Sequence, residues 1–321
     1  MTIDRTELDL LRGALGDLAT AHPGDLRDAL RDFGWQDLLA EDPEVAVGVL
    51  FRLQGERLTP ETLLDEVVLA ALDPAGAALA SAVAFPLPGQ DLSSRYDHDG
   101  VRVDGLLTRP VSAGETVLVP CRALGGAAVL VVPVDGLQQA PTSGIDLDRP
   151  WVRVSGRAHP GGVDHVGGSD AWERMLAAGR RALAAELIGI GTRMLDLAVE
   201  HTSSRVQFGQ ALASFQVVRH KLADVRVWGE VAGLAFSAAW EDTDPLAAAL
   251  AKSAAVRYSS TAREHVQQLL GGMGFSWEHD FHRYLRRALV LEPLLGGATT
   301  LRSEIGSAVV ESGRLPDLAA L

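Results

Sequence analysis

Two short segments in the second half of the 321-residue chain combine anion-binding side chains with glycines. The residues that could do chemistry there are Arg205, Gln207 and Phe208 in the first segment and Gln268, Gly271 and Gly272 in the second. A guanidinium, carboxamides and free backbone N–H groups at a helix end can bind a phosphate or the edge of an adenine ring. Each segment by itself fits equally well a break between helices, in which glycines end the helix and Arg205 neutralises a neighbour.

The other reactive residues predict neither a metal site nor a nucleophile. Residues 97–99 read Asp-His-Asp before a glycine, which indicates a solvated turn, and the nine histidines show no spacing typical of a zinc site. The one cysteine, Cys121, lies in an apolar run and is predicted to be a small buried side chain. The basic cluster of Arg283, Arg286 and Arg287 is interpreted as a solvated or ion-paired helix face rather than an anion site.

The elements that must position the two segments change in character along the chain. Residues 1–73 carry leucines at helical spacing and are divided by prolines into short helices. Residues 74–166 alternate or run apolar between glycine and proline turns, which is typical of strands. Residues 167–321 return to long helical patterns with short breaks. The predicted fold is therefore α+β and mainly α, with N-terminal helices, a small central β-domain and a C-terminal antiparallel helical bundle.

Helix start signals occur in the third region. Ser169, with acidic residues in the turn after it, is predicted to cap the first bundle helix. Asp244 and Pro245 predict the start of the third bundle helix, which should end near Gly271. Both chemical segments are therefore expected at breaks between bundle helices.

The composition is that of a globular protein, with 47% hydrophobic and 22% charged residues. The net charge of −13 argues against a nucleic-acid partner, which needs a basic protein face. The longest uncharged stretch, residues 74–90, is shorter than the about 20 residues of a membrane helix. The charged N-terminus does not resemble a signal peptide. A cytoplasmic protein with neither a nucleic-acid nor a membrane partner is therefore predicted.

Taken together and in this order, the two segments resemble signatures of the acyl-CoA dehydrogenase family. That family carries Arg-x-Gln-Phe-Gly and Gln-x-x-Gly-Gly-x-Gly, and both are intact within residues 200–305. In the family they hold the pyrophosphate and adenosine half of the FAD of a neighbouring subunit. The resemblance implies FAD as cofactor, with the contacts made by Arg205, Gln207, Phe208, Gln268, Gly271 and Gly272.

The chain departs from the family where the flavin ring and the substrate would be held. The family loop Thr-Glu-Pro-x-x-Gly-Ser-Asp is matched by residues 84–91, but Ala84 and Gln90 replace its two hydroxyl residues. The position of the family's catalytic glutamate, in a Glu-Gly-Thr motif, holds Leu295. A minority of the family carries the base on the first bundle helix, and the corresponding residues 178–181 contain no carboxylate. No catalytic residue is therefore predicted in this chain.

This pattern of losses predicts one subunit of a heteromeric acyl-CoA dehydrogenase, of α2β2 composition. The partner is a catalytic acyl-CoA dehydrogenase subunit that supplies the glutamate, the flavin-ring contacts and most of the acyl-CoA cleft. This chain supplies the adenosine-side grip on FAD, and its first two regions are short for the family. The resemblance extends to paired subunits of actinobacterial steroid catabolism, so a steroid-derived acyl-CoA is the expected substrate class.

Two alternatives remain open from the sequence. In the first, the chain is a self-sufficient homo-oligomeric acyl-CoA dehydrogenase with an unusual base such as Glu292 or Glu304. In the second, it is a pseudoenzyme that has lost flavin and keeps its helical bundle as a structural partner.

Overall fold

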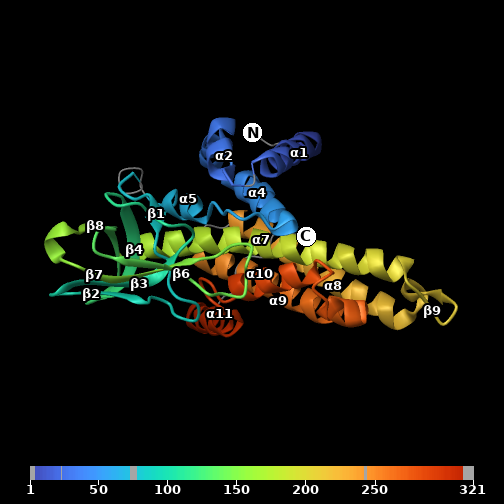
Figure 1. Ribbon diagram of the computed structural model, residues 1–321. Coiled ribbons are helices and arrows are strands. Elements are labelled where there is room, and N and C mark those ends of the chain that lie inside the picture. Colours follow the sequence, from blue (N-terminus) through green and yellow to red (C-terminus); the bar gives the residue numbers. More distant parts are fainter. Residues whose placement is uncertain (1–3, 23, 73–77, 242–243, 314–321) are drawn as a thin grey trace.

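The computed structural model describes residues 4–22, 24–72, 78–241 and 244–313. A β-sheet lies at one end of the molecule, a long helical bundle extends from it, and short N-terminal helices cover one side of the bundle (Figure 1). The predicted fold class is confirmed: the chain is mainly α, with N-terminal helices, a small sheet and a C-terminal bundle. Among the described residues, no helix combines the length and hydropathy that crossing a membrane requires.

The N-terminal region consists of short helices, as its prolines predict. They are α1 (Arg5–Ala21), α2 (Leu26–Phe33), α3 (Trp35–Glu41), α4 (Pro43–Arg57) and α5 (Leu64–Leu69). The carboxylate of Asp4 begins α1 by accepting the backbone N–H groups of Thr6 and Glu7. Pro43 is the first residue of α4, and the Asp42 carboxylate before it accepts the N–H of Val45.

The central strands form one sheet in the order β6-β7-β3-β2-β4-β5-β8, with β1 beside β4. Their bounds are β1 (Ala82–Val83), β2 (Ser94–Asp97), β3 (Gly100–Leu107), β4 (Thr116–Ala123), β5 (Gly126–Pro133), β6 (Gln138–Pro141), β7 (Val152–Ala158) and β8 (Asp164–Gly167). Strands β3 and β7 pair antiparallel from Val101 opposite Ala158 to Leu107 opposite Val152. Valines that alternate along these strands fill a small core of their own.

The bundle consists of three long helices and two shorter ones. They are α7 (Ser169–Ser204), α8 (Gln216–Glu241), α9 (Pro245–Leu270), α10 (Phe281–Leu291) and α11 (Ala298–Ser312). Asp244 caps α9 as predicted, since its carboxylate accepts the N–H of Leu246. The prediction for Ser169 is wrong: it is the first residue of α7, and its hydroxyl accepts the N–H of Ala127 in β5 instead. The division at residues 73 and 166 stays a prediction.

Side-chain contacts fix the directions of the three long helices. The Arg181 guanidinium in α7 donates to the Ala239 carbonyl near the end of α8 at 2.7 Å. His265 near the end of α9 lies 3.7 Å from the carboxylate of Asp224 near the start of α8. Neighbouring helices are therefore antiparallel, so α7 and α9 both end at the tip of the bundle that is distant from the sheet (Figure 1).

The N-terminal helices approach the bundle so closely that two glycines are required. A Cβ atom at Gly55 in α4 would lie 2.2 Å from the carbonyl oxygen of Glu186 in α7. A Cβ atom at Gly189 in α7 would lie 2.0 Å from the carbonyl oxygen of Arg52 in α4. Because neither backbone atom can move without bending a helix, any larger residue would push α4 away from α7.

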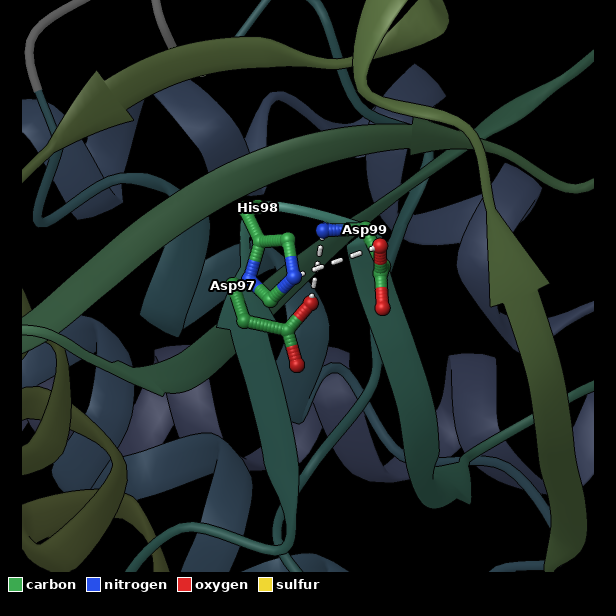
Figure 2. A group of neighbouring side chains, drawn as sticks. All are labelled: Asp97, His98 and Asp99. Carbon is green, nitrogen blue, oxygen red and sulfur yellow. Dashed lines mark hydrogen bonds and ion pairs between the residues drawn. The ribbon is translucent and has the colours of Figure 1, made fainter.

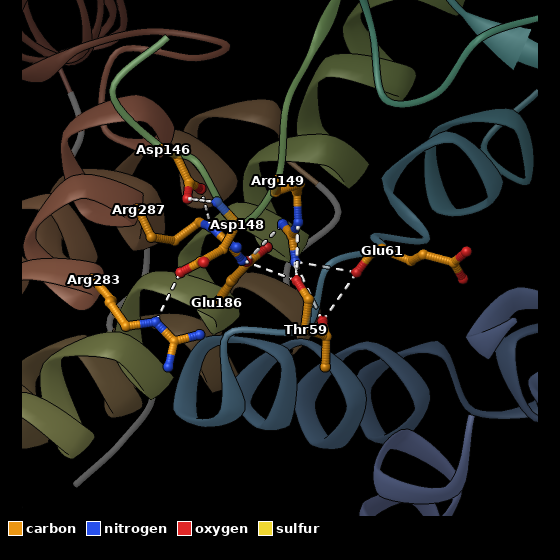
Figure 3. A network of polar contacts seen from close by, with 8 residues as sticks. All are labelled: Thr59, Glu61, Asp146, Asp148, Arg149, Glu186, Arg283 and Arg287. Atoms are coloured by element: carbon orange, nitrogen blue, oxygen red, sulfur yellow. Dashed lines mark hydrogen bonds and ion pairs between the residues drawn. The ribbon is translucent and has the colours of Figure 1, made fainter. Parts of the chain in front are cut away.

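A buried ionic network lies beside this crossing and joins four parts of the chain (Figure 3). Arg149, in the connection between β6 and β7, donates to the carboxylate of Glu186 at 2.8 Å and to the carbonyl of Thr59 at 2.9 Å. Arg287 of α10 pairs with Asp146 and also reaches Glu186 at 3.4 Å. Burial lowers the pKa of Arg149 to about 10, with a smaller effect from the positive charge of Arg287. Of the basic cluster considered in the sequence, Arg283 and Arg287 are thus ion-paired, and Arg287 is fully buried and does not lie on a solvated face.

Glu186→Gln removes the carboxylate shared by Arg149 and Arg287 while keeping the shape of the side chain. We expect the free energy of unfolding to fall by about 3–5 kcal/mol, because two buried guanidiniums then share one carboxylate. Urea denaturation followed by circular dichroism measures this change. The matched control is Glu200→Gln, which breaks the more exposed Arg193–Glu200 pair on the same helix and should cost less than about 1 kcal/mol. Equal losses in the two variants would contradict the stabilising role of the network.

Candidate functional site

The first sequence segment lies in an exposed hairpin at the tip of the bundle. Arg205 follows the last residue of α7, and the short strands β9 (Val206–Gln207) and β10 (Gln210–Ala211) form the hairpin after it. Phe208 stands at the turn with a φ of 53° and a side chain that is 92% exposed. Its ring packs edge-on against Phe215, with 6.3 Å between ring centroids. The turn therefore presents Arg205, Gln207 and Phe208 outward, in solvent.

The second segment ends α9 at the same tip. Gln268 lies exposed in the last turn of α9, and the 3₁₀ helix η3 (Gly271–Phe275) follows directly. Gly271 has a φ of 57° and a ψ of −129°, a backbone conformation that favours glycine. A Cβ atom at Gly271 or at Gly272 would meet nothing within 4 Å, so the backbone there is open to an approaching group. Gly274 differs, since a Cβ there would lie 2.9 Å from the carbonyl of Gln267.

The structure brings both segments to one end of the bundle and leaves their polar groups available. Burial lowers the pKa of His201 near the end of α7, and the positive charges of His279 and Arg205 lower it further. His279 follows η3, so this effect places the two segments within electrostatic range of a common residue. Within the described ranges, the Arg205 and Gln268 side chains make no hydrogen bond or ion pair. A ligand or a partner can therefore take their donors without breaking an existing contact.

Exposed aromatic side chains follow the glycines of the second segment along the chain. Phe275 is 76% exposed and Trp277 is 73% exposed, and Arg286 stacks on the Trp277 ring at 4.8 Å from its centroid. Sequence reasoning did not single out Trp277, although an aromatic residue shortly after a glycine-rich helix end was a visible signal. Large apolar side chains gathered around unpaired polar groups are typical of a surface that another molecule covers.

A second candidate site is a cavity of about 690 Å³ between the sheet and the bundle. It is lined by the loop of residues 89–91, by Arg180 in α7, by Leu295 and Gly296, and by hydroxyl residues of α11 such as Thr299. These are the stretches that the sequence matched to the family's flavin loop and to its two positions for the base. The tertiary structure therefore brings together around one cavity the segments that the sequence matched to the family's flavin loop and base positions.

Basic side chains hold the wall of this cavity in place. Arg180 is buried, donates to the carbonyl of Leu295 at 3.0 Å, and binds both carboxylate oxygens of Glu304 at 2.7 Å. Lys252 is fully buried and donates to three backbone carbonyls of residues 292–296, at 3.2 Å for Glu292 and 2.8 Å for Gly296. Burial lowers the pKa of Lys252 well below its ordinary value, and the nearby Arg180 lowers it further.

The side chains that could act as an unusual base are both ion-paired. Glu292 binds Arg263 at 2.8 Å and does not line the cavity. Burial raises the pKa of Glu292, although Arg263 opposes the shift. Glu304 does line the cavity, where Arg180 holds it. Leu295, at the position matched to the family's glutamate, is buried with a φ of 55°. The position of the base thus holds an apolar side chain on a clamped loop.

Two further sequence predictions concern reactive residues outside these sites. Asp97, His98 and Asp99 are close enough to share a cation, and they lie exposed at the turn between β2 and β3 (Figure 2). The N–H of Asp99 donates to the Asp97 carboxylate at 2.9 Å, so an ordinary turn explains their closeness. Cys121 is buried in β4, and burial raises the pKa of its thiol to about 12. The prediction of a small buried cysteine is confirmed.

A family model matches the part of the chain that forms the helical bundle. Residues 167–310 match the acyl-CoA dehydrogenase C-terminal domain. Over 130 residues the chain is 41% identical to the acyl-CoA dehydrogenase IpdE2 of Mycobacterium tuberculosis, a match that covers 40% of this chain and 41% of the relative. Over 272 residues it is 30% identical to FadE34 of the same organism, covering 70% of this chain and 38% of the relative. The chain thus spans about two fifths of the length of these curated relatives.

Solved structures with the same fold include proteins described as pairs. A variant of the Tcur3481–Tcur3483 steroid ACAD superposes with a TM-score of 0.80 at 24% identity, covering 96% of this chain and 99% of the other. The ChsE4–ChsE5 complex of M. tuberculosis superposes with a TM-score of 0.74 at 23% identity, covering 97% and 99%. At these identities the likeness establishes the fold.

The family model and the fold thus identify an acyl-CoA dehydrogenase-type chain. Residues 167–310 belong to the acyl-CoA dehydrogenase family, and the described chain as a whole has the fold of its members. The resemblance to the acyl-CoA dehydrogenase family, inferred from the two sequence segments, is therefore confirmed.

Lys252→Met tests the clamp on the loop beside the cavity. We expect the free energy of unfolding to fall by about 3 kcal/mol, because three carbonyl oxygens of the loop lose their common donor. Amide hydrogen exchange of residues 294–297 should accelerate about tenfold as the loop opens locally. The control is Lys221→Met, which changes the chain's other lysine, in α8. Unchanged exchange of the loop in Lys252→Met would contradict the clamp.

Proposed function

We propose that this chain is one subunit of a heteromeric, FAD-dependent acyl-CoA dehydrogenase of α2β2 composition. One observation carries the proposal: the tip of the bundle offers unpaired anion-binding groups, whereas the chain's own cavity contains Leu295 at the position of the base. A subunit that completes a partner's cofactor site, and performs no chemistry in its own, needs this combination. The solved pairs with the same fold are consistent with such a division.

The residues at the tip have the chemistry needed for the adenosine and pyrophosphate half of FAD. The guanidinium of Arg205 would pair with a phosphate, and the open space beside Gly271 and Gly272 would let the phosphate approach the backbone closely. The carboxamides of Gln207 and Gln268 would reach the polar edge of the adenosine. Phe208 adds a flat apolar surface beside them. These six residues are a proposed site, in which the side chains of Arg205 and Gln268 have no partner among the described residues.

The partner subunit is proposed to carry the chemical step. Its glutamate would remove the α proton of the acyl-CoA thioester, and FAD, when bound, would supply the hydride acceptor that forming an α,β-double bond requires. The residues of this chain bind and orient the distant half of the cofactor, and they do not touch the substrate's reacting carbons. The description of a solved fold neighbour as a steroid ACAD supports a steroid-derived acyl-CoA as substrate class.

The regions of the chain have separate parts in this proposal. The described residues from 167 onward form the bundle that grips the partner's cofactor. Within residues 1–73, the shortened helical region, α4 packs against α7, and within residues 74–166, the reduced β-region, the loop of residues 89–91 lines the clamped cavity. Arg180, Lys252 and Glu304 keep that cavity ordered without a base.

Co-expression with the candidate partner, followed by quantitation of flavin, tests the division of roles. We expect the chain alone to purify without FAD and the complex to hold one FAD per pair of unlike subunits. The reason is that the proposed contacts of this chain reach only the adenosine and pyrophosphate half of the cofactor. Stoichiometric FAD and dehydrogenase activity in the chain alone would instead support a self-sufficient enzyme with Glu304 as its base. A stable complex without flavin would support a structural pseudoenzyme.

Arg205→Ala tests the cofactor contacts one residue at a time. In the complex we expect FAD to bind about 30-fold more weakly, or about 2 kcal/mol, because a charge-assisted hydrogen bond to phosphate is lost. Fluorescence titration of the flavin-depleted complex measures the affinity. Arg302→Ala, which removes an exposed arginine of α11, is the matched control and should leave FAD affinity unchanged. Equal affinities in both variants would contradict the assignment of Arg205.

A further inference from the structure

Helix α11 forms one wall of the cavity of about 690 Å³ between the sheet and the bundle. Among the described residues of this helix, Leu301 is the one that is buried. A helix that packs on a core usually turns an apolar stripe inward. The residues that α11 contributes to the cavity wall are instead polar and recur at helical spacing: Thr299, Thr300, Ser303, Glu304 and Ser307. An apolar inner face therefore does not hold α11 against the cavity.

An ion pair joins this polar face of α11 to α7. Both oxygens of the Glu304 carboxylate lie 2.7 Å from the guanidinium of Arg180, in the bidentate geometry that favours a carboxylate. The Arg180 side chain is only 4% exposed and also donates to the Leu295 carbonyl, whereas the Glu304 side chain is 41% exposed. The guanidinium is therefore the fixed half of the pair, and the carboxylate is the half that can leave.

The chain has a fixed point and two glycines directly before α11. Lys252 donates to the carbonyl of Gly296 at 2.8 Å, so the loop is held up to this residue. Gly296 has a φ of 112°, and Gly297 precedes the first turn of α11 without a side-chain cap. Adjacent glycines let the backbone dihedral angles change at low cost. A rotation there would swing α11 without moving the clamped loop.

We propose that α11 is a lid on this cavity and that Glu304 is its latch, in the place that an external carboxylate would take on Arg180. Among the residues that line the cavity, Arg180 carries the one positive charge of a lysine or arginine. A carboxylate that enters the cavity forms the same two hydrogen bonds and releases Glu304 to solvent. The contact is therefore autoinhibitory, because the chain's own side chain keeps the site closed until a ligand competes for the guanidinium.

The other lining residues define the ligand by charge and polarity. Asp91 and Glu173 also line the cavity, and their negative charges oppose a dianion more strongly than a monoanion. Trp172, Leu176 and Leu295 contribute apolar surface to the same cavity. The ligand class is therefore a small monocarboxylic acid with an apolar body. The lid does not rest on the proposed contacts with FAD, which lie at the tip of the bundle.

Amide hydrogen exchange of the full chain tests the lid. In Glu304→Gln we expect the amides of residues 300–310 to exchange at least tenfold faster, because the latch is lost and the helix opens locally. The amides of residues 294–296 should keep their exchange rates, since Lys252 still holds that loop. The matched control is Glu311→Gln, the same change at an exposed position of α11 that does not line the cavity. Circular dichroism checks that both variants keep the parent fold.

Titration calorimetry at constant ionic strength tests the ligand class, with benzoate as the carboxylate probe and inorganic phosphate as the more highly charged probe. Glu304→Gln leaves the guanidinium of Arg180 without its carboxylate, so this variant should bind benzoate at least tenfold more tightly than the parent chain. Glu311→Gln should bind benzoate as the parent chain does. Saturating benzoate should also accelerate exchange of α11 in the parent chain, because the ligand releases the latch.

Unchanged exchange of α11 in Glu304→Gln overturns the lid, and so does equal acceleration of α11 and of residues 294–296. A variant that binds benzoate no more tightly than the parent chain overturns the carboxylate site. Binding of phosphate in place of benzoate rejects the ligand class. Flavin content of the unlike pair is measured in parallel. A pair without FAD would reject the proposed function and leave the lid standing, because the two proposals concern different ends of the bundle.

Discussion

The pairing of two buried guanidiniums with Glu186 is the interaction on which the arrangement of the molecule depends. Arg149 arrives from the sheet and Arg287 from α10, and both reach the carboxylate of Glu186 in the middle of α7. Thr59 and Asp146 take up further donors of the same two guanidiniums. Because buried charges are costly unless they are paired, these segments cannot separate one at a time. The network thus fixes α10, and with it the η3 turn before α10 and the clamped loop after it.

The fixed position of α10 has different consequences for the segment before it and for the loop after it. Before it, the backbone around Gly271 and Gly272 is left open, and the donors of Arg205 and Gln268 stay unpaired at the tip of the bundle. After it, residues 292–296 are tied down through their carbonyls by Lys252, and Arg180 binds Leu295. Polar groups are therefore satisfied internally at one site and available at the other. The proposed role, a subunit that lends binding groups rather than catalytic ones, requires such a difference between the two sites.

The surface of the bundle also carries large apolar side chains that this chain leaves uncovered. Exposed aromatic residues cluster at the tip, with Phe208, Phe275 and Trp277 all largely in solvent. Along α8 an apolar stripe lies opposite the buried one. Exposing such side chains gains nothing for a lone chain, since apolar area that remains in water contributes no stability to the fold. Both surfaces make sense if folding of this chain is followed by assembly.

The sequence by itself determined the helices and strands, the two segments at helix ends and the family they signify, because periodicity and capping are written in neighbouring residues. Asp244 and the glycines after α9 were predictable for that reason, whereas Ser169 was misjudged because its hydroxyl pairs with Ala127 across the sheet. Only the tertiary structure decided that Arg287 is buried, that Arg180 holds Glu304, and that both segments share one tip. These contacts join residues that are far apart in the chain, so no local sequence pattern predicts them. They form only when α4 and α10 pack against α7.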